Sequence, residues 1–317
     1  MKLEVVTAAS VDYDEIVRLQ REAFFGVASQ EQLDANQTPQ YYKWKYTMAG
    51  GEARVAQVRD AGGMLVAMNS MFPLALTDGT RTVRGWQSCD TSTHPKARGQ
   101  GWFVKCLQAL KATLSDGDIF FGFPNRNSTT GFVKSGCQRL SILSMFAGII
   151  PTFRPRPFVE RIERYGPEQD ALARRLPGGR MMIARTAAYL NDRYHSPQKS
   201  LYTSFVYQGQ GGPEGFLVVR PLLMYRMRFG LVMECMATSL DIERELHLHA
   251  GSWCRQEGII FALTLNNVSD RGALMSRGLF PVPQRITPRP VVLMAEVMGA
   301  GPLPSQWASH VGDWDVF

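Results

Sequence analysis

The residues best suited to chemistry lie at positions 89–103, where a run that predicts a strand leads into a glycine-bearing turn and then a helix. Gly99 and Gly101 lack a Cβ, so the turn can adopt positive φ and a ligand can approach its backbone closely. The N–H groups at a helix start lack partners within the helix, and with the helix dipole they attract an anion. Arg98 and Lys96 add side-chain charge. The segment predicts a phosphate-binding turn, although two such glycines also occur in ordinary turns.

A helix is expected after this turn, because apolar residues recur there at spacings of three and four. They are Phe103, Cys106, Leu107, Leu110 and Leu114. Neither the Gly-Lys-Ser/Thr phosphate loop nor the three-glycine dinucleotide pattern occurs at this turn. We therefore expect a different pyrophosphate ligand.

The turn resembles the coenzyme A turn of the GNAT superfamily of acyl-CoA-dependent N-acetyltransferases, whose pattern is Gln/Arg-x-x-Gly-x-Gly/Ala. Arg98 and Gly101 match this pattern, and His94-Pro95 precedes them at the end of the expected strand. Phe103 departs from it, because the family usually has Gly or Ala there.

A second segment is similar to the next strand and helix of the same superfamily, with the spacing Asn-x6-Tyr-x-Lys-x-Gly. Asn125, Lys134 and Gly136 match it, and Phe132 stands at the tyrosine position. Two motifs in the family's order are more specific than either motif alone.

The resemblance implies an acyl-CoA co-substrate, most often acetyl-CoA, and no metal. The strand before the turn would pair with the pantetheine arm, the turn would hold the pyrophosphate, and Asn125 would lie beside the arm. The coenzyme-binding residues expected in this way are Thr91, Ser92, Thr93, Arg98, Gly99, Gln100, Gly101, Trp102, Phe103, Val104 and Asn125.

The catalytic residues of the family are not present at the corresponding positions of this sequence. Phe132 cannot donate the proton of the family's tyrosine, and Phe120 stands where some members carry an acidic base. Asp90 is the preferred base, because it is a carboxylate on the strand next to the expected thioester. A hydrogen-bonded structural role for Asp90 is the alternative. His94 could move a proton, but before Pro95 it more often caps the strand end.

The aromatic and basic cluster at positions 41–44 supplies the candidates for substrate binding. Tyr41 and Trp44 could stack on a sugar or nucleotide ring. Ordinary packing of an amphipathic helix would explain them equally well. His247 and His249, two residues apart on an expected helix, would face different sides, so we expect no metal site there.

Composition limits the class of protein. The 317 residues are 45% hydrophobic and carry a net charge of +7. The basic residues are scattered, so nucleic acid is not an expected partner. No apolar run approaches the length of a membrane span, so a membrane is not expected either. The five cysteines are widely spaced and odd in number, which favours reduced thiols and a cytoplasmic location over a disulfide framework. The sequence leaves the oligomeric state open and is compatible with an oligomer.

The expected order of elements in the first half is β-α-β-β-β-α-β-α, which resembles the GNAT core. Five segments of the second half repeat this order at offsets of about 142 to 152 residues, as a repeat would. Among them, Asn125 with Gly136 recurs as Asn267 with Gly278. We therefore expect an α/β (α+β) fold with two tandem GNAT-like mixed-sheet domains. Residues 1–150 would bind coenzyme, 151–180 would be a Pro/Arg-rich connector, and 181–317 would be a degenerate GNAT-like domain.

The two halves differ at the position of the turn. The second half has residues 239–244 there, with no glycine and two acids, which would repel a pyrophosphate. Only the first half is expected to bind coenzyme.

The expected function is an acyl-CoA-dependent N-acyltransferase that acetylates a primary amine of a small molecule, such as an amino sugar, an antibiotic intermediate or an amino acid. Two alternatives stay open. One is transfer of a longer acyl chain from acyl-CoA or from an acyl carrier protein, and the other is a non-catalytic acyl-CoA-binding module.

Overall fold

The computed structural model describes residues 1–24, 38–151, 154–196, 201–224, 226–267, 271–283 and 291–314. The chain divides into two compact units. The first contains Met1–Ala75, Val83–Arg139 and Leu293–Leu303, and the second contains Leu76–Thr82, Leu140–Val292 and Pro304–Phe317.

The strands of the first unit follow the order β1-β2-β3-β4-β5-β14. Their bounds are Lys2–Thr7, Arg54–Arg59, Leu65–Thr77, Thr82–Thr93, Ile119–Gly122 and Val291–Val297. Strand β2 pairs with β1 and β3 in antiparallel fashion, whereas β4 and β5 are parallel and β14 is antiparallel to β5. A parallel pair requires a crossover, and here the crossover contains the expected phosphate turn and helix.

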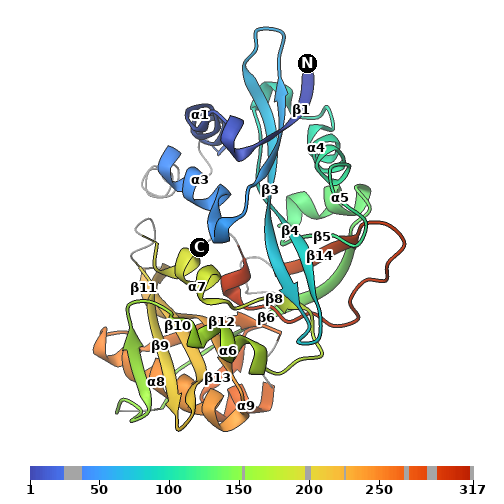
Figure 1. Ribbon diagram of the computed structural model, residues 1–317. Coiled ribbons are helices and arrows are strands. Elements are labelled where there is room, and N and C mark those ends of the chain that lie inside the picture. The colour runs from blue at the N-terminus through green and yellow to red at the C-terminus, as the bar shows by residue number, and fades with distance from the viewer. Residues whose placement is uncertain are drawn as a thin grey trace. The chain divides into compact units, whose positions relative to one another are not determined.

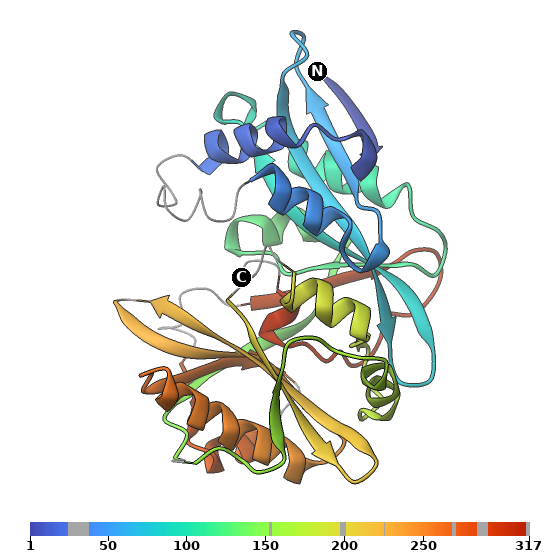
Figure 2. The same ribbon diagram turned by 60° about the vertical axis from the view of Figure 1, so that its left-hand side comes forward.

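Helices cover both sides of these strands. Their bounds are α1 Tyr13–Phe24, α3 Pro39–Tyr46, α4 Trp102–Lys111 and α5 Arg126–Lys134. Figure 1 shows α1 and α3 on one side of the strands and α4 and α5 on the other, and Figure 2 shows α1 beside α3 from a second direction. Thr38 begins α3 by accepting a hydrogen bond from the Tyr41 N–H at 3.1 Å, as an N-cap does.

The second unit has the strand order β6-β12-β11-β10-β9-β7, with β13 paired to β6. The bounds are β6 Gln138–Gly148, β12 Phe261–Asn266, β11 Met227–Ala237, β10 Gly212–Met224, β9 Thr203–Gly209, β7 Val159–Ile162 and β13 Leu279–Pro281. Strand β10 is antiparallel to β9 and β11, and β11 is parallel to β12. A short strand, β8 Met182–Ile183, pairs with the end of β3.

Helices of the second unit also lie on both faces of its strands. Their bounds are α6 Glu168–Arg175, α7 Ala187–Tyr194, α8 Leu240–Gln256 and α9 Arg271–Ser276, with a 3-10 turn η4 at Val311–Asp313. Side chains of β10 alternate: Leu217 packs in the core with Trp253 of α8, whereas Phe216 contacts Tyr165 on the other face.

The expected mixed α/β class is confirmed. The units, however, are not contiguous halves of the chain. Five residues of β6, from Ser144 to Gly148, pair with β12 in the second unit, whereas most of β14 pairs with β5 in the first. Each unit thus contains a strand from the other half of the sequence. A single boundary at position 150 does not describe this division.

Residues 151–180, expected as a connector, contain regular structure of the second unit. Strand β7 pairs with β9, and helix α6 buries Leu172 completely. The prolines stand at element boundaries instead of inside them: Pro157 lies two residues before β7 and Pro167 is the N-cap of α6. Proline at such places starts an element instead of breaking it.

Three buried histidines of the second unit predict acid sensitivity. Burial lowers the pKa of His247, His249 and His310 to about 4 each, from 6.5, so they are neutral when folded. The folded state therefore binds fewer protons than the unfolded state, and stability is lost as pH falls from 6.5 through 4. Burial also raises the pKa of Asp313 to about 6. Protonation of this carboxyl therefore adds to the stability of the folded state as pH falls from 6 to 3.8.

At about 1.4 kcal/mol per pKa unit, the three histidines outweigh the one carboxyl by several kcal/mol. We expect the free energy of unfolding, measured in urea, to fall by that amount between pH 7 and pH 4. A constant or rising value over this range would contradict the assignment of neutral buried imidazoles.

Candidate active site

The glycine turn between β4 and α4 has the geometry that the sequence predicts. Gly99 and Gly101 have φ of 77° and 74°, and a Cβ built on either would meet nothing within 4 Å. Gly101 is the N-cap of α4 and provides no side-chain cap. The first N–H groups of α4 therefore have no side-chain cap among the described residues, and N–H groups at such a helix start can bind an anion.

Two side chains around the turn, those of Arg98 and Trp102, form hydrogen bonds within the first unit. Arg98 Nη2 donates to the Ala23 carbonyl of α1 at 2.7 Å, and its Nε donates to the Thr93 carbonyl at 3.4 Å. Trp102 Nε1 donates to Gln100 at 3.2 Å. Thus Arg98 ties the turn to α1 and to the end of β4.

His94 caps the 3-10 turn that follows β4, which is the capping role considered for it above. Its Nδ1 accepts from the Lys96 N–H at 3.2 Å at the start of the 3-10 turn Pro95–Ala97, and its Nε2 lies 3.7 Å from Glu22. These contacts account for the imidazole without a catalytic role.

Strand β4 separates from β5 before it reaches the turn. Their parallel pairing covers only Gly85–Gln87 opposite Ile119–Phe121, and β4 then continues to Thr93. Asp90 lies in this separated part with a φ of 47°, a left-handed conformation that Asp tolerates better than most residues. The residue is thus held in a local distortion where the two strands diverge.

The Asp90 carboxylate pairs with a buried lysine that we did not single out from the sequence. Lys45 Nζ of α3 lies 2.8 Å from Asp90 Oδ1, and the two side chains are 2% and 12% exposed. The other carboxylate oxygen, Oδ2, is buried with no hydrogen-bond partner among the residues that the structure describes. A buried acceptor of this kind is costly unless a donor reaches it.

The substrate candidates lie beside this pair. Tyr41 and Trp44 are in ring contact at 5.6 Å, and Lys45 Nζ lies 5.8 Å from the Tyr41 ring centre. One turn of α3 therefore places an aromatic pair next to the lysine that holds Asp90. Both aromatic side chains are half-buried, so part of each stays exposed.

Three phenylalanines at unusual positions form one cluster. Phe132 lies 6.0 Å from Phe103 and 6.1 Å from Phe120, measured between ring centres. Glycines make room for them: a Cβ on Gly131 would lie 2.2 Å from Phe103, and one on Gly122 would lie 2.9 Å from Phe132. Their departures from the family pattern are therefore coupled by packing, and all three lack a group that can move a proton.

Three of the other coenzyme candidates have side-chain hydrogen bonds within the first unit. Asn125 is the N-cap of α5, where its Oδ1 accepts from the Asn127 and Ser128 N–H groups at 2.9 and 3.1 Å. Thr91 Oγ1 accepts from Asn69, and Ser92 Oγ donates to Gln20 at 2.6 Å. These bonds orient Asn125, Thr91 and Ser92 within the first unit and engage only the Oδ1 atom of the Asn125 amide.

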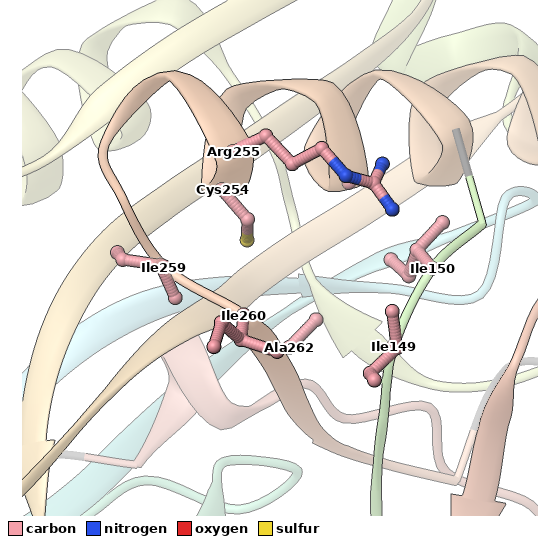
Figure 3. A pocket seen from close by; sticks show the side chains of 8 residues that line it. Ile149, Ile150, Cys254, Arg255, Ile259, Ile260 and Ala262 are labelled. Carbon is pink, nitrogen blue, oxygen red and sulfur yellow. The ribbon is translucent and has the colours of Figure 1, made fainter. Parts of the chain in front are cut away.

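The second unit contains a separate small pocket of about 90 Å³ (Figure 3). It is lined by Ile149, Ile150, Gly251, Cys254, Arg255, Ile259, Ile260 and Ala262. It is far smaller than a typical ligand site of several hundred Å³. Burial raises the pKa of Cys254 to about 12, so its thiol is not a nucleophile at neutral pH.

The described residues contain no group of three or more His, Cys, Asp or Glu that could hold a metal ion. No helix in the described part of the chain is both long and apolar enough to cross a membrane.

Comparison with known proteins decides the fold family. The chain matches no family model and no curated protein sequence. Solved structures do match: a GCN5-related N-acetyltransferase from Anabaena variabilis has a TM-score of 0.66 at 11% identity, covering 94% of this chain and 73% of that one. The chain has the GNAT fold.

Two further structures extend this similarity. A GCN5-related N-acetyltransferase from Kribbella flavida has a TM-score of 0.60 at 13% identity, covering 94% of this chain and 71% of that one. The N-myristoyltransferase of Saccharomyces cerevisiae, with bound myristoyl-CoA, has a TM-score of 0.60 at 11% identity, covering 100% and 84%. The similarity extends over 94% to 100% of this chain.

Proposed function

We propose that this protein is an acyl-CoA-dependent N-acyltransferase with its coenzyme site in the first unit. One observation carries the proposal: an open turn with two left-handed glycines begins α4, directly after the part of β4 that has separated from β5. The turn offers N–H groups to a pyrophosphate, and the separated strand offers backbone groups to a pantetheine arm. The solved GNAT structures support the same assignment.

The reaction would be direct transfer of an acyl group to a primary amine. The neutral amine attacks the thioester carbonyl, an N–C bond forms, the C–S bond breaks, and coenzyme A leaves as thiolate. The amine loses one proton, which Asp90 Oδ2 accepts directly or through water, and the thiolate takes up a proton as it departs. Backbone N–H groups of β4 would stabilise the oxyanion of the tetrahedral intermediate.

Lys45 and the aromatic pair would define the acceptor side of this site. The ammonium of Lys45 fixes Asp90 Oδ1 at 2.8 Å, and the buried Oδ2, which has no donor among the described residues, would take the proton of the amine through water. Tyr41 and Trp44 would contact the body of the acceptor, as a small molecule with a ring or apolar portion. We expect no metal in this chemistry.

Two kinds of acyl donor are candidates for this reaction. Acetyl-CoA is the first candidate donor because two of the similar structures are N-acetyltransferases. A longer acyl chain is the second, since the similar N-myristoyltransferase holds myristoyl-CoA. An acyl carrier protein could deliver such a chain, and the net charge of +7 would suit an acidic carrier. A carrier-dependent reaction would weaken steeply with salt.

Asp90→Asn tests the catalytic assignment. We expect kcat/KM for the amine to fall by about 100-fold to 10,000-fold, the usual contribution of a general base, with acyl-CoA affinity unchanged. The measurement is the initial rate of coenzyme A release, followed with a thiol reagent across pH.

The buried lysine requires a second variant as control. Asp90→Asn leaves Lys45 buried without a carboxylate, which alone could lower stability. The double variant Asp90→Asn/Lys45→Met removes both charges. If Asp90 is a base, the double variant stays as inactive as the single one. If Asp90 only balances Lys45, the double variant recovers turnover, and the catalytic assignment is wrong.

A further inference from the structure

We infer that residues 306–313, here called the strap, fill the groove of the second unit that corresponds to the coenzyme groove of the first. The second unit would thus carry a built-in peptide ligand in place of acyl-CoA. The comparison with a coenzyme groove rests on the proposed function, whereas the binding of the strap does not.

The second unit repeats the strand divergence of the first. Strands β11 and β12 pair in parallel only through Phe229–Val232 and Phe261–Thr264. A register shift follows in β11, and Glu234 lies two residues after the last paired residue of that strand. Asn267 lies three residues after the last paired residue of β12.

The first unit has the same chemical groups at nearly the same steps. Asp90 lies three residues after the last paired residue of β4, which is Gln87. Asn125 lies four residues after the last paired residue of β5, which is Phe121. In each unit an acid and an asparagine therefore follow the point where the parallel strands diverge.

In the second unit the asparagine binds the strap. Asn267 Nδ2 donates to the Trp307 carbonyl at 2.8 Å, and its Oδ1 accepts from the Ser309 N–H at 2.7 Å. The Asn267 N–H also donates to the Ser309 carbonyl at 3.3 Å. The side-chain amide thus pairs with an extended backbone as another amide would, and a pantetheine arm presents amides of the same kind.

The acid of the second unit holds the other end of the strap through one arginine. Arg185 lies 2.6 Å from Glu234 and 2.6 Å from Asp313, and all three side chains are at most 1% exposed. Tyr194 donates to Glu234 at 2.6 Å. A Cβ on Gly312 would lie 2.0 Å from the Tyr194 oxygen, so the strap approaches this network at its glycine.

Burial shows how completely the strap fills this space. Ser309 and Val311 have no exposed surface, and Ala308 is 1% exposed. The 3-10 turn η4 contacts both β11 and β12, the two strands that diverge. The strap is also held by the Ala308 N–H, which donates to the Met181 carbonyl at 2.8 Å. The strap therefore lies buried against the two diverging strands.

A matched pair of substitutions tests the inference. Asn267→Asp keeps the oxygen that accepts from Ser309 but replaces the donor to Trp307 by a carboxylate oxygen facing a carbonyl. Asn125→Asp makes the same change in the first unit and keeps the α5 cap, because Asp and Asn cap equally well. Amide hydrogen exchange of residues 306–313 and acetyl-CoA affinity are measured for wild type and both variants.

We expect the wild-type strap to exchange as slowly as β11 and β12. Asn267→Asp should accelerate its exchange at least about 10-fold, which corresponds to about 1.4 kcal/mol, with acetyl-CoA affinity unchanged. Asn125→Asp should leave strap exchange unchanged and weaken acetyl-CoA binding about 10-fold.

The outcomes separate the two claims. A rapidly exchanging wild-type strap would overturn the inference even if Asn267→Asp did not fold. Unchanged exchange in Asn267→Asp, or weaker acetyl-CoA binding in that variant, would overturn it as well. Failure of acetyl-CoA to bind the wild-type chain would instead contradict the proposed function, and the exchange data would still decide whether the strap is the ligand of the second unit.

Discussion

Arg98→Glu is expected to abolish acyl-CoA binding, with a loss of affinity of at least about 100-fold, or about 2.7 kcal/mol. Arg98 brings a guanidinium to the glycine turn and fixes the turn to α1 through the Ala23 carbonyl at 2.7 Å. Glutamate would place a negative charge beside the site proposed for the pyrophosphate and would face a carbonyl with a carboxylate. Calorimetric titration with acetyl-CoA measures the change.

Arg84→Glu is the matched control for this substitution. Arg84 is exposed on β4 in the same unit, and its replacement changes the net charge by the same amount. We expect it to lower affinity by no more than a few-fold through long-range electrostatics. If both variants lose affinity equally, overall charge attracts the ligand and the turn is not its site. Thermal melts of both variants exclude unfolding as the cause.

Arg185→Met is expected to destabilise the protein by about 3 to 5 kcal/mol, the usual cost of leaving a buried ion pair without one partner. Here one guanidinium pairs with two carboxylates, Glu234 and Asp313, both at a distance of 2.6 Å. Its removal would leave two buried negative groups beside each other. Urea unfolding followed by circular dichroism gives the change in free energy.

Arg161→Met is the control in the same unit. Arg161 and Glu163 form an exposed pair at 3.5 Å, with side chains 65% and 87% exposed. Such pairs contribute at most about 1 kcal/mol. An equally small effect for Arg185→Met would mean that the Arg185 network does not stabilise the second unit.

Local signals in the sequence predicted the glycine turn and the helix after it. Gly99 and Gly101 both have positive φ, and α4 begins where the apolar spacing starts. Such features depend on neighbouring residues alone, because turn conformation and helical periodicity are local properties.

Contacts between distant residues could not be predicted in the same way. Lys45 and Asp90 are 45 positions apart, and nothing in the spacing of either residue indicates the other. One signal was available: Lys45 follows Tyr41 by four residues, on the face of α3 that carries the aromatic cluster. A lysine on an otherwise aromatic face indicates a buried partner charge.

The pairing of a strand from one half of the sequence with the unit formed mainly by the other half could not be predicted from the sequence either. Strand β14 pairs with β5 across more than 160 positions, and Lys111 Nζ meets Glu296 at 2.6 Å across 185. A repeat read along the sequence assigns each strand to its own half. Pairing depends instead on which edge is open when the last strand is added, a property of the assembled units.

Direct titration of the wild-type chain with acetyl-CoA is the decisive measurement, because every catalytic assignment requires a coenzyme site at the glycine turn. We expect saturable binding at one site per chain in the calorimeter. Absence of binding, or two equivalent sites per chain, would contradict it.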